Sequence, residues 1–183
     1  MQDLRETHRA LLERWRKSMN LVGPGPVDVH FEDSEKALAP LQPAGRWVDL
    51  GSGAGFPGLP LAAMHPQLVV DLVDSRRKRC TFLNEVLGRA GVSAERVAVH
   101  CMRVENLTGP YDGVVSRAFA PPAVVLDHAE RLLVKGGTLV LFLQEEADVP
   151  SDPRFEMFHV EHYEVAGRRR KSVFMVIPTE SAD

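Results

Sequence analysis

Cysteines and long apolar runs are scarce in this sequence of 183 residues. Its two cysteines, Cys80 and Cys101, are too few for a disulfide framework or a structural zinc site, so both are predicted to be reduced thiols in the core. No apolar run approaches the roughly 20 residues that cross a bilayer, and the first residues lack the apolar segment of a secretory signal. We therefore expect a soluble cytoplasmic protein that does not bind membranes.

The sequence also lacks an excess of positive charge. It has 22 Lys and Arg against 25 Asp and Glu, a net charge of −3 with neutral histidines. Such a chain does not attract nucleic acid as a whole, so a polyanionic partner must meet a local patch. Two basic runs are candidates, Arg76–Arg79 and Arg168–Lys171. Either run can contact phosphate or simply form a solvated face.

The central part of the chain alternates short apolar runs with helix-length segments. With 44% hydrophobic and 26% charged residues, the composition is that of one globular domain with a short appendage. The runs are apolar on both faces, which is typical of a parallel sheet covered on both sides. They predict strands at residues 47–50, 68–73, 97–101, 113–116 and 138–143. Right-handed crossovers between them give a doubly wound α/β fold.

The two ends of the chain depart from this alternation. The first 20 residues predict an amphipathic helix, and a second helix is expected at about residues 31–41, capped by Asp33 or Ser34. The apolar residues of the first helix share one face: Leu4, Leu11, Leu12, Trp15 and Met19. At the other end, residues 155–165 and 172–178 predict an antiparallel hairpin around the loop AGRRRK.

The segment VDLGSGAGFPG, residues 48–58, follows the first predicted strand. Gly51, Gly53 and Gly55 can turn sharply and admit a ligand close to the backbone, and a helix is expected to open at Pro57. A helix N-terminus offers free N–H groups and positive potential, and ligands of such sheets bind at the carboxyl ends of the strands. The segment therefore predicts a ligand site, although glycines at such a turn can also serve close packing alone.

The identity of the ligand depends on two carboxylates. Residues 53–58 also match the dinucleotide pattern G-x-G-x-x-G, and Asp74 can accept hydrogen bonds from a ribose in either case, or merely cap the next helix. Asp49, close to the glycines, would repel a pyrophosphate but tolerate a cationic sulfonium. That carboxylate and the terminal hairpin, a usual addition to methyltransferase sheets, favour S-adenosylmethionine over NAD.

Several motifs together resemble one known family. In order, they are WRKSMNLVG, HFEDS, DLGSGAGFPGLPLA, LVDSRRKRCTFL, MRVENL and VSRAFAP. With these motifs the chain resembles the bacterial small-subunit ribosomal RNA guanine-N7 methyltransferases, the glucose-inhibited division protein B family, over about residues 10–143. The resemblance implies a seven-stranded, mostly parallel Rossmann-like sheet at residues 46–183, which would form an S-adenosylmethionine-dependent methyltransferase domain. Residues 1–45 would be a helical extension packed on it.

The resemblance also implies which residues bind the donor. The family's donor-binding positions correspond to Gly51, Phe56, Val104, Glu105 and Arg117. Phe56 would wall the donor pocket and the turn at Val104 and Glu105 would border the adenine. Arg117 would meet a carboxylate or the incoming RNA, or else pair with an acid such as Asp112.

Gly53, Gly55 and Asp74 join the predicted donor site on the physical grounds given above. The implied partner is 16S ribosomal RNA, within the small subunit, and the chain is expected to be a monomer. No catalytic residue is expected, because N7 of guanine carries a lone pair and loses no proton on methylation. Aligning the two reactants supplies most of the acceleration in such a reaction.

One departure from the family leaves alternatives open. The family usually has a Lys-Gly pair at the end of the fifth strand, where this chain has Gln144 and Glu145. A carboxylate there should weaken phosphate contact, so a non-catalytic, ribosome-associated protein that binds S-adenosylmethionine is one alternative, and an NAD-dependent oxidoreductase is another. His159 and His162 would face opposite sides of a strand, so no metal site is expected.

Overall fold

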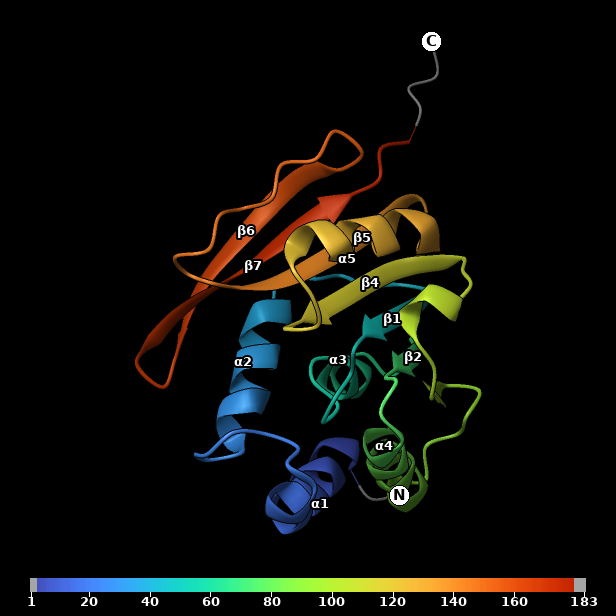
Figure 1. The fold of residues 1–183 in the computed structure, drawn as a ribbon, viewed down its shortest axis with the longest axis vertical. Helices are drawn as coiled ribbons and strands as arrows, with labels where there is room; N and C mark the ends of the chain where they lie inside the picture. Colours follow the sequence, from blue (N-terminus) through green and yellow to red (C-terminus); the bar gives the residue numbers. More distant parts are fainter. Residues whose placement is uncertain (1–2, 180–183) are drawn as a thin grey trace.

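A seven-stranded sheet runs through the middle of the molecule and carries helices on both faces (Figure 1). The computed structural model describes residues 3–179. The elements in chain order are α1 (Leu4–Met19), α2 (Asp28–Leu38), β1 (Arg46–Leu50), α3 (Gly58–Met64), β2 (Val69–Val73), α4 (Arg77–Ala90), β3 (Val97–His100), the 3-10 helix η1 (Val104–Asn106), β4 (Tyr111–Arg117), α5 (Pro122–Leu132), β5 (Leu133–Gln144), β6 (Glu156–Val165) and β7 (Arg168–Val176).

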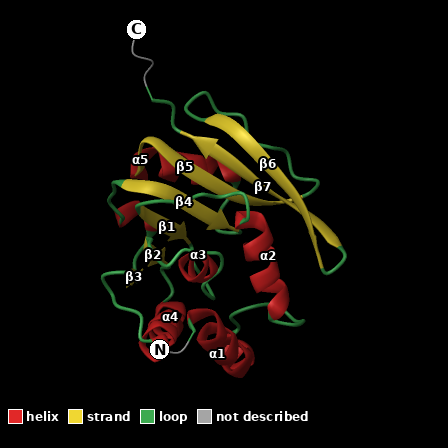
Figure 2. Cartoon of the chain, turned by 180° about the vertical axis from the view of Figure 1, so that it is seen from behind, coloured by secondary structure: helices red, strands yellow, loops and turns green. Residues whose placement is uncertain are grey.

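The strands lie in the order β3-β2-β1-β4-β5-β7-β6. Strands β1 to β5 pair in parallel, and β7 runs antiparallel to both β5 and β6. From β1 the chain builds the sheet outward through β2 and β3, and it then returns to the other side of β1 to form β4 and β5. Right-handed crossovers therefore place α3 and α4 on one face of the sheet and α5 on the other. Helices α1 and α2 lie on the face of α3 and α4 (Figure 2). The predicted doubly wound, mostly parallel sheet is confirmed.

The apolar residues of the strands form a separate core on each face of the sheet. One core gathers residues of α1 to α4, including Leu12, Phe31 and Phe82, and the other gathers residues of α5 with the segments around Leu107 and Phe155. The connection from β3 to β4 contains only η1, so the expectation of a helix-length crossover there is wrong. Among residues 3–179, no helix is long and apolar enough to span a membrane.

Helix α1 has the predicted amphipathic form, whereas the prediction for α2 needs correction. Asp3 caps α1 by accepting a hydrogen bond from the backbone N–H of Arg5, at 2.8 Å. Helix α2 begins at Asp28, three residues before the predicted start, and its N-cap position carries no side-chain hydrogen bond. Asp33 and Ser34 therefore lie inside the helix and do not cap it. The Ser34 hydroxyl donates to the carbonyl of His30, 2.9 Å away.

The terminal hairpin is present, but its turn is shorter than predicted. Ala166 and Gly167 form a two-residue turn with φ of +50° and +71°, and Val165 pairs directly with Arg168. Positive φ at both central residues is typical of type I′ turns, which join tightly twisted strands. The basic run Arg168–Lys171 thus belongs to strand β7, and the expected loop AGRRRK is wrong.

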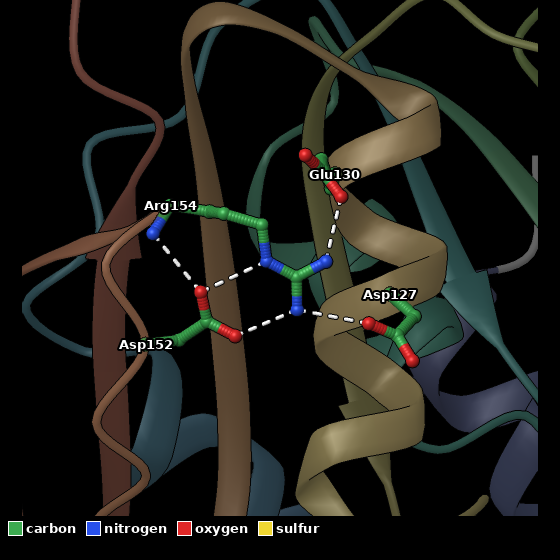
Figure 3. A network of polar contacts seen from close by, with 4 residues as sticks. All are labelled: Asp127, Glu130, Asp152 and Arg154. Carbon is green, nitrogen blue, oxygen red and sulfur yellow. Dashed lines mark hydrogen bonds and ion pairs between the residues drawn. The ribbon is translucent and has the colours of Figure 1, made fainter.

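The segment that leads into the hairpin is attached to α5 by one arginine. The guanidinium of Arg154 forms ion pairs with Asp127 and Glu130 of α5, at 2.8 and 2.6 Å, and with Asp152, at 2.6 Å (Figure 3). Hydrogen bonds from Arg154 lower the pKa of Asp152 to about 2, so this carboxylate is charged at neutral pH. The network fixes the start of β6 against α5 and so helps to orient the hairpin.

Candidate functional site

The loop between β1 and α3 holds the three predicted glycines in left-handed conformations. Gly51, Gly53 and Gly55 have φ of +73°, +57° and +96°. The backbone N–H groups of Gly51 and Ser52 both donate to the carbonyl of Val73, each at 2.9 Å, which ties the loop to the end of β2. Since residues with a Cβ rarely adopt this conformation, it favours glycine at all three positions.

The surroundings of the three glycines differ. A Cβ at Gly51 would lie 2.5 Å from the ring of Phe119, and one at Gly55 would lie 2.5 Å from Leu59. A Cβ at Gly53 would meet nothing closer than the guanidinium of Arg79, at 3.6 Å. Close packing explains the first two glycines, whereas a Cβ at Gly53 would fit in ordinary van der Waals contact with Arg79, so packing does not explain this glycine. Packing alone therefore does not account for the loop.

Asp49 lies beneath the loop and does not face its open side. The side chain is fully buried, and Oδ2 accepts a hydrogen bond from the backbone N–H of Gly58 at the start of α3, at 2.9 Å. Its Oδ1 has no partner among the described residues. Burial raises the pKa of Asp49 to about 7, so the carboxyl is only partly ionised at neutral pH. The expected repulsion of a pyrophosphate is thus weaker than the sequence suggested.

Asp74, at the end of β2, joins the glycine loop to the start of α4. Its Oδ2 accepts a hydrogen bond from the N–H of Gly53 at 2.9 Å and pairs with Arg79 at 3.3 Å, while Oδ1 accepts from the N–H of Arg76 at 2.8 Å. The carboxylate therefore joins the glycine loop to Arg76, the residue that precedes α4. It binds no backbone N–H of the first turn of α4, so the alternative that Asp74 merely caps this helix is wrong. Each carboxylate oxygen has two lone pairs and three of these four are used, so Oδ1 can accept one further hydrogen bond.

The turn after β3 follows the carboxyl end of that strand, at the same edge of the parallel sheet as the glycine loop. Within η1, Val104 is buried and Glu105 is exposed. The guanidinium of Arg131, from α5, donates hydrogen bonds to the carbonyls of Val104, at 2.8 Å, and Leu107. The conformation of this predicted adenine-bordering turn is thus fixed from the second face of the sheet.

Arg117, the last residue of β4, forms an ion pair with α2. Its Nη1 donates to Oδ2 of Asp33 at 2.6 Å, and its Nη2 lies 3.2 Å from Nδ1 of His30. The expected partner Asp112 is wrong, because that carboxylate accepts a hydrogen bond from the backbone N–H of Arg46. Burial and the nearby Arg117 charge lower the pKa of His30 to about 4, so this imidazole is neutral at pH 7.

Phe56 packs beneath Arg117 among the N-terminal helices. Its ring is 4% exposed and lies 4.8–5.4 Å, between ring centroids, from His8, His30 and Phe31. The guanidinium carbon of Arg117 lies 5.3 Å from the centroid of the Phe56 ring. This ring links the glycine loop to α1 and α2. Almost all of its surface is buried, so at most a small part of it can line the donor pocket, the role that the resemblance implies.

Two contributors to the site were missed by the sequence analysis. Nε2 of His8, on α1, lies 2.7 Å from the carbonyl of Ala54 in the glycine loop, and burial lowers the pKa of His8 to about 4. Tyr163, on β6, donates from its hydroxyl to Oδ1 of Asp33, at 3.0 Å. His8 lies one turn from Leu4 and Leu12 on the apolar face of α1, a position that could have identified it as buried.

A cleft of about 630 Å³ adjoins the site at the carboxyl ends of β4 and β5. Helix α2 and the β6–β7 hairpin form its sides. Its polar lining comes from His30, Asp33, Ser116, Arg117, Gln144, Tyr163, Arg168 and Arg170. The size is in the range of small-molecule sites in proteins.

The remaining candidates lie apart from this site or have other partners. His159 and His162 bind Glu161 and Glu145, at 3.0 and 3.1 Å. Within residues 3–179, no group of three His, Cys, Asp or Glu residues could hold a metal ion. Cys80 is buried as predicted, but Cys101 is exposed, so its predicted core position is wrong.

Comparisons with known proteins agree with this geometry. A family model described as rRNA small subunit methyltransferase G matches residues 2–171. Ribosomal RNA small subunit methyltransferase G of Methylobacterium nodulans is 41% identical over 155 residues, which cover 75% of this chain and 71% of the relative. The protein of the same name from Rhodospirillum rubrum is 39% identical over 150 residues, covering 78% and 72%.

Solved structures share the fold at much lower sequence identity. Magnesium protoporphyrin IX methyltransferase from Synechocystis, crystallised with bound S-adenosylmethionine, superposes with a TM-score of 0.63 at 14% identity, covering 96% of this chain and 98% of that one. TrmN from Thermus thermophilus gives a TM-score of 0.58 at 21% identity, covering 85% and 55%. The sheet is therefore that of methyltransferases.

Proposed function

The chain belongs to the rRNA small subunit methyltransferase G family, and from this premise we propose that it transfers a methyl group from S-adenosylmethionine to N7 of a guanine in 16S ribosomal RNA. The family makes the chain an S-adenosylmethionine-dependent enzyme that methylates ribosomal RNA. The choice of N7 of a guanine as the methylated atom goes beyond what membership of the family shows and is our proposal.

The observation that carries this proposal is the left-handed backbone of Gly53 beside Asp74, at a position where packing does not require glycine. A Cβ at Gly53 would occupy the space over the loop without touching any other part of the protein closer than 3.6 Å. The N–H of Gly53 donates to the buried carboxylate of Asp74, whose one remaining lone pair can accept a ribose hydroxyl. A loop of this form suits a nucleoside that approaches the backbone closely.

We assign the donor contacts to Gly51, Gly53, Gly55, Phe56, Asp74, Val104, Glu105 and Arg117. When bound, S-adenosylmethionine supplies an electrophilic methyl group on a sulfonium. The histidines beside the site, His8 and His30, are neutral at pH 7, so neither adds a positive charge next to that cation.

The side chains of the protein bind and orient the two reactants. Guanine N7 needs no general base, so the site requires no proton acceptor. The ion pair of Arg117 with Asp33 fixes the guanidinium in the lining of the cleft, where it can orient a bound group. Catalysis by alignment is consistent with these roles.

The wider organisation follows the same proposal. We propose the division into a helical extension, residues 1–45, and a methyltransferase domain, residues 46–183; among the residues that the structure describes, α1 and α2 of this extension pack on the core. We propose that the protein acts as a monomer in the cytoplasm, on 16S rRNA within the small ribosomal subunit. Protein and RNA surfaces of a subunit can supply recognition that a net charge of −3 does not.

A second candidate function rests on Glu145. This carboxylate stands where the family usually has a cation, and it binds His162 and Arg169, both at 3.1 Å. It thereby neutralises charge that would otherwise face RNA. A ribosome-associated protein that binds S-adenosylmethionine without transferring its methyl group would have the same feature.

Methyl transfer to defined substrates separates the two candidates. Small subunits and free 16S rRNA from a strain that lacks this gene are incubated with the protein and methyl-labelled S-adenosylmethionine, and the modified base is mapped. We expect one N7-methylguanine, with subunits the better substrate. Donor binding without incorporation of label would support the non-catalytic candidate, and label on another base or atom would contradict the proposed target.

A further inference from the structure

The four basic residues at the start of β7 are sorted between two faces of the sheet. Successive side chains of a strand point to opposite faces, so Arg168 and Arg170 share one face and Arg169 and Lys171 the other. Arg168 and Arg170 line the cleft at the carboxyl ends of β4 and β5. Arg169 pairs instead with the carboxylate of Glu145 at 3.1 Å, and Nζ of Lys171 donates to the carbonyl of Glu145 at 2.9 Å.

The inner wall of the cleft carries a connected set of polar groups. Asp33 accepts hydrogen bonds from Arg117, at 2.6 Å, and from the hydroxyl of Tyr163, at 3.0 Å. Arg117 also packs over the Phe56 ring of the glycine loop. Through Arg117 the cleft therefore adjoins the loop assigned to the donor, and the hairpin contributes Tyr163, Arg168 and Arg170 to its lining.

The cleft is positive although the chain as a whole is negative. Its lining holds three guanidinium groups, those of Arg117, Arg168 and Arg170, against one carboxylate, that of Asp33. His30, which also faces the cleft, is neutral at pH 7. Burial raises the pKa of Tyr163, so its phenol stays protonated and uncharged. Such a lining favours an anionic ligand.

We propose that this cleft binds the acceptor nucleotide of the RNA, with the base directed inward to Arg117 and the flanking phosphates held by Arg168 and Arg170. This inference rests on the proposed function, since it names the acceptor site of that reaction. An enzyme that modifies a base must draw it out of its stack into a pocket, and arginine forks bind phosphate oxygens well. Arg169 and Lys171 make no phosphate contact.

Equilibrium binding of RNA tests whether Arg168 and Arg170, and not Arg169, contact the RNA. The double variant R168Q/R170Q is compared with the wild type and with R169Q, using 16S rRNA from a strain that lacks this gene, at several salt concentrations and with S-adenosylhomocysteine present. We expect the double variant to weaken RNA binding on the order of 100-fold, about tenfold for each charged contact. The slope of log K against log salt should fall by about 1.4, the value for two contacts to single-stranded RNA.

Two controls make the result specific. R169Q should change RNA affinity by less than about twofold, because exposed ion pairs contribute little. R168K/R170K should keep most of the salt slope, and the affinity of all variants for S-adenosylhomocysteine, measured by calorimetry, should be unchanged.

The proposal is overturned if R169Q weakens RNA binding as much as the double variant, if the double variant binds RNA like the wild type, or if the wild type does not bind RNA. It is also overturned if the double variant loses affinity for S-adenosylhomocysteine, because the cleft would then hold the donor. The comparison measures affinity and not turnover. A protein that binds RNA but transfers no methyl group would therefore refute the proposed function alone.

Discussion

Replacing Gly53 with alanine should separate ligand binding from folding. With φ of +57°, an alanine at this position is strained by about 1–2 kcal/mol. The new Cβ meets nothing closer than 3.6 Å, so no clash adds to this strain. The same Cβ enters the space where we place the donor. We therefore expect a modest loss of stability together with a loss of at least about tenfold in affinity for S-adenosylhomocysteine, equivalent to about 1.4 kcal/mol.

Gly51→Ala is the matched control for packing. Its φ of +73° gives a similar strain, but its Cβ would lie 2.5 Å from the Phe119 ring. Overpacking of this kind costs about 1–3 kcal/mol more, so the total loss should be about 2–5 kcal/mol. Urea unfolding gives the stabilities, and calorimetry at a temperature where all variants are folded gives the affinities.

If Gly53→Ala binds S-adenosylhomocysteine as tightly as the wild type, the donor does not lie against the α-carbon of Gly53. Equal losses of stability in the two variants would contradict the predicted stabilities, because the difference between them rests on the Phe119 contact alone.

Three further predictions concern charged groups. Asp74→Ala should lower the free energy of unfolding by about 2–3 kcal/mol in urea titrations, because two backbone N–H groups lose their acceptor, and Asp74→Asn should lose less. The pKa of Asp49 is about 7 in the folded protein, against an ordinary value of 3.8. Between about pH 4 and pH 7 the folded chain therefore keeps a proton that the unfolded chain has released. The free energy of unfolding falls as the pH rises through this window. Asp49→Asn, compared with the wild type by unfolding at pH 5.5 and 7.5, should therefore gain about 2 kcal/mol relative to the wild type at the higher pH, and an equal difference at both would contradict this. The exposed side chains of Arg76–Lys78 form no ion pair within residues 3–179, so replacing all three with glutamine should lower the salt slope of RNA binding by about 2, and an unchanged slope would remove this run from the interface.

The sheet could be predicted because its strands are apolar on both faces. Trp47 and Val48 of β1, like Leu72 and Val73 of β2, are buried on opposite faces of the sheet, and such runs leave few alternatives to a covered parallel sheet. The glycine loop was predictable for a related reason. Glycines at alternate positions after a strand indicate left-handed backbone, which the structure has at all three.

The features that were predicted wrongly depend on contacts across the fold. Asp33 looked like a helix cap, yet its carboxylate binds Arg117 and Tyr163, which follow 84 and 130 residues later. No local signal marks these partners. The hairpin turn was hidden because Ala166 adopts a φ of +50° where asparagine or glycine is usual, so the basic residues of β7 resembled a loop.

A crystal structure of the protein with S-adenosylhomocysteine would show directly whether the glycine loop binds the donor. We predict that the nucleoside lies against the backbone of Gly53, with its ribose hydroxyls at Asp74 and its adenine beside the turn of Val104 and Glu105. Ligand bound elsewhere, or a glycine loop closed by side chains at saturating ligand, would contradict the assignment of this loop as the donor site.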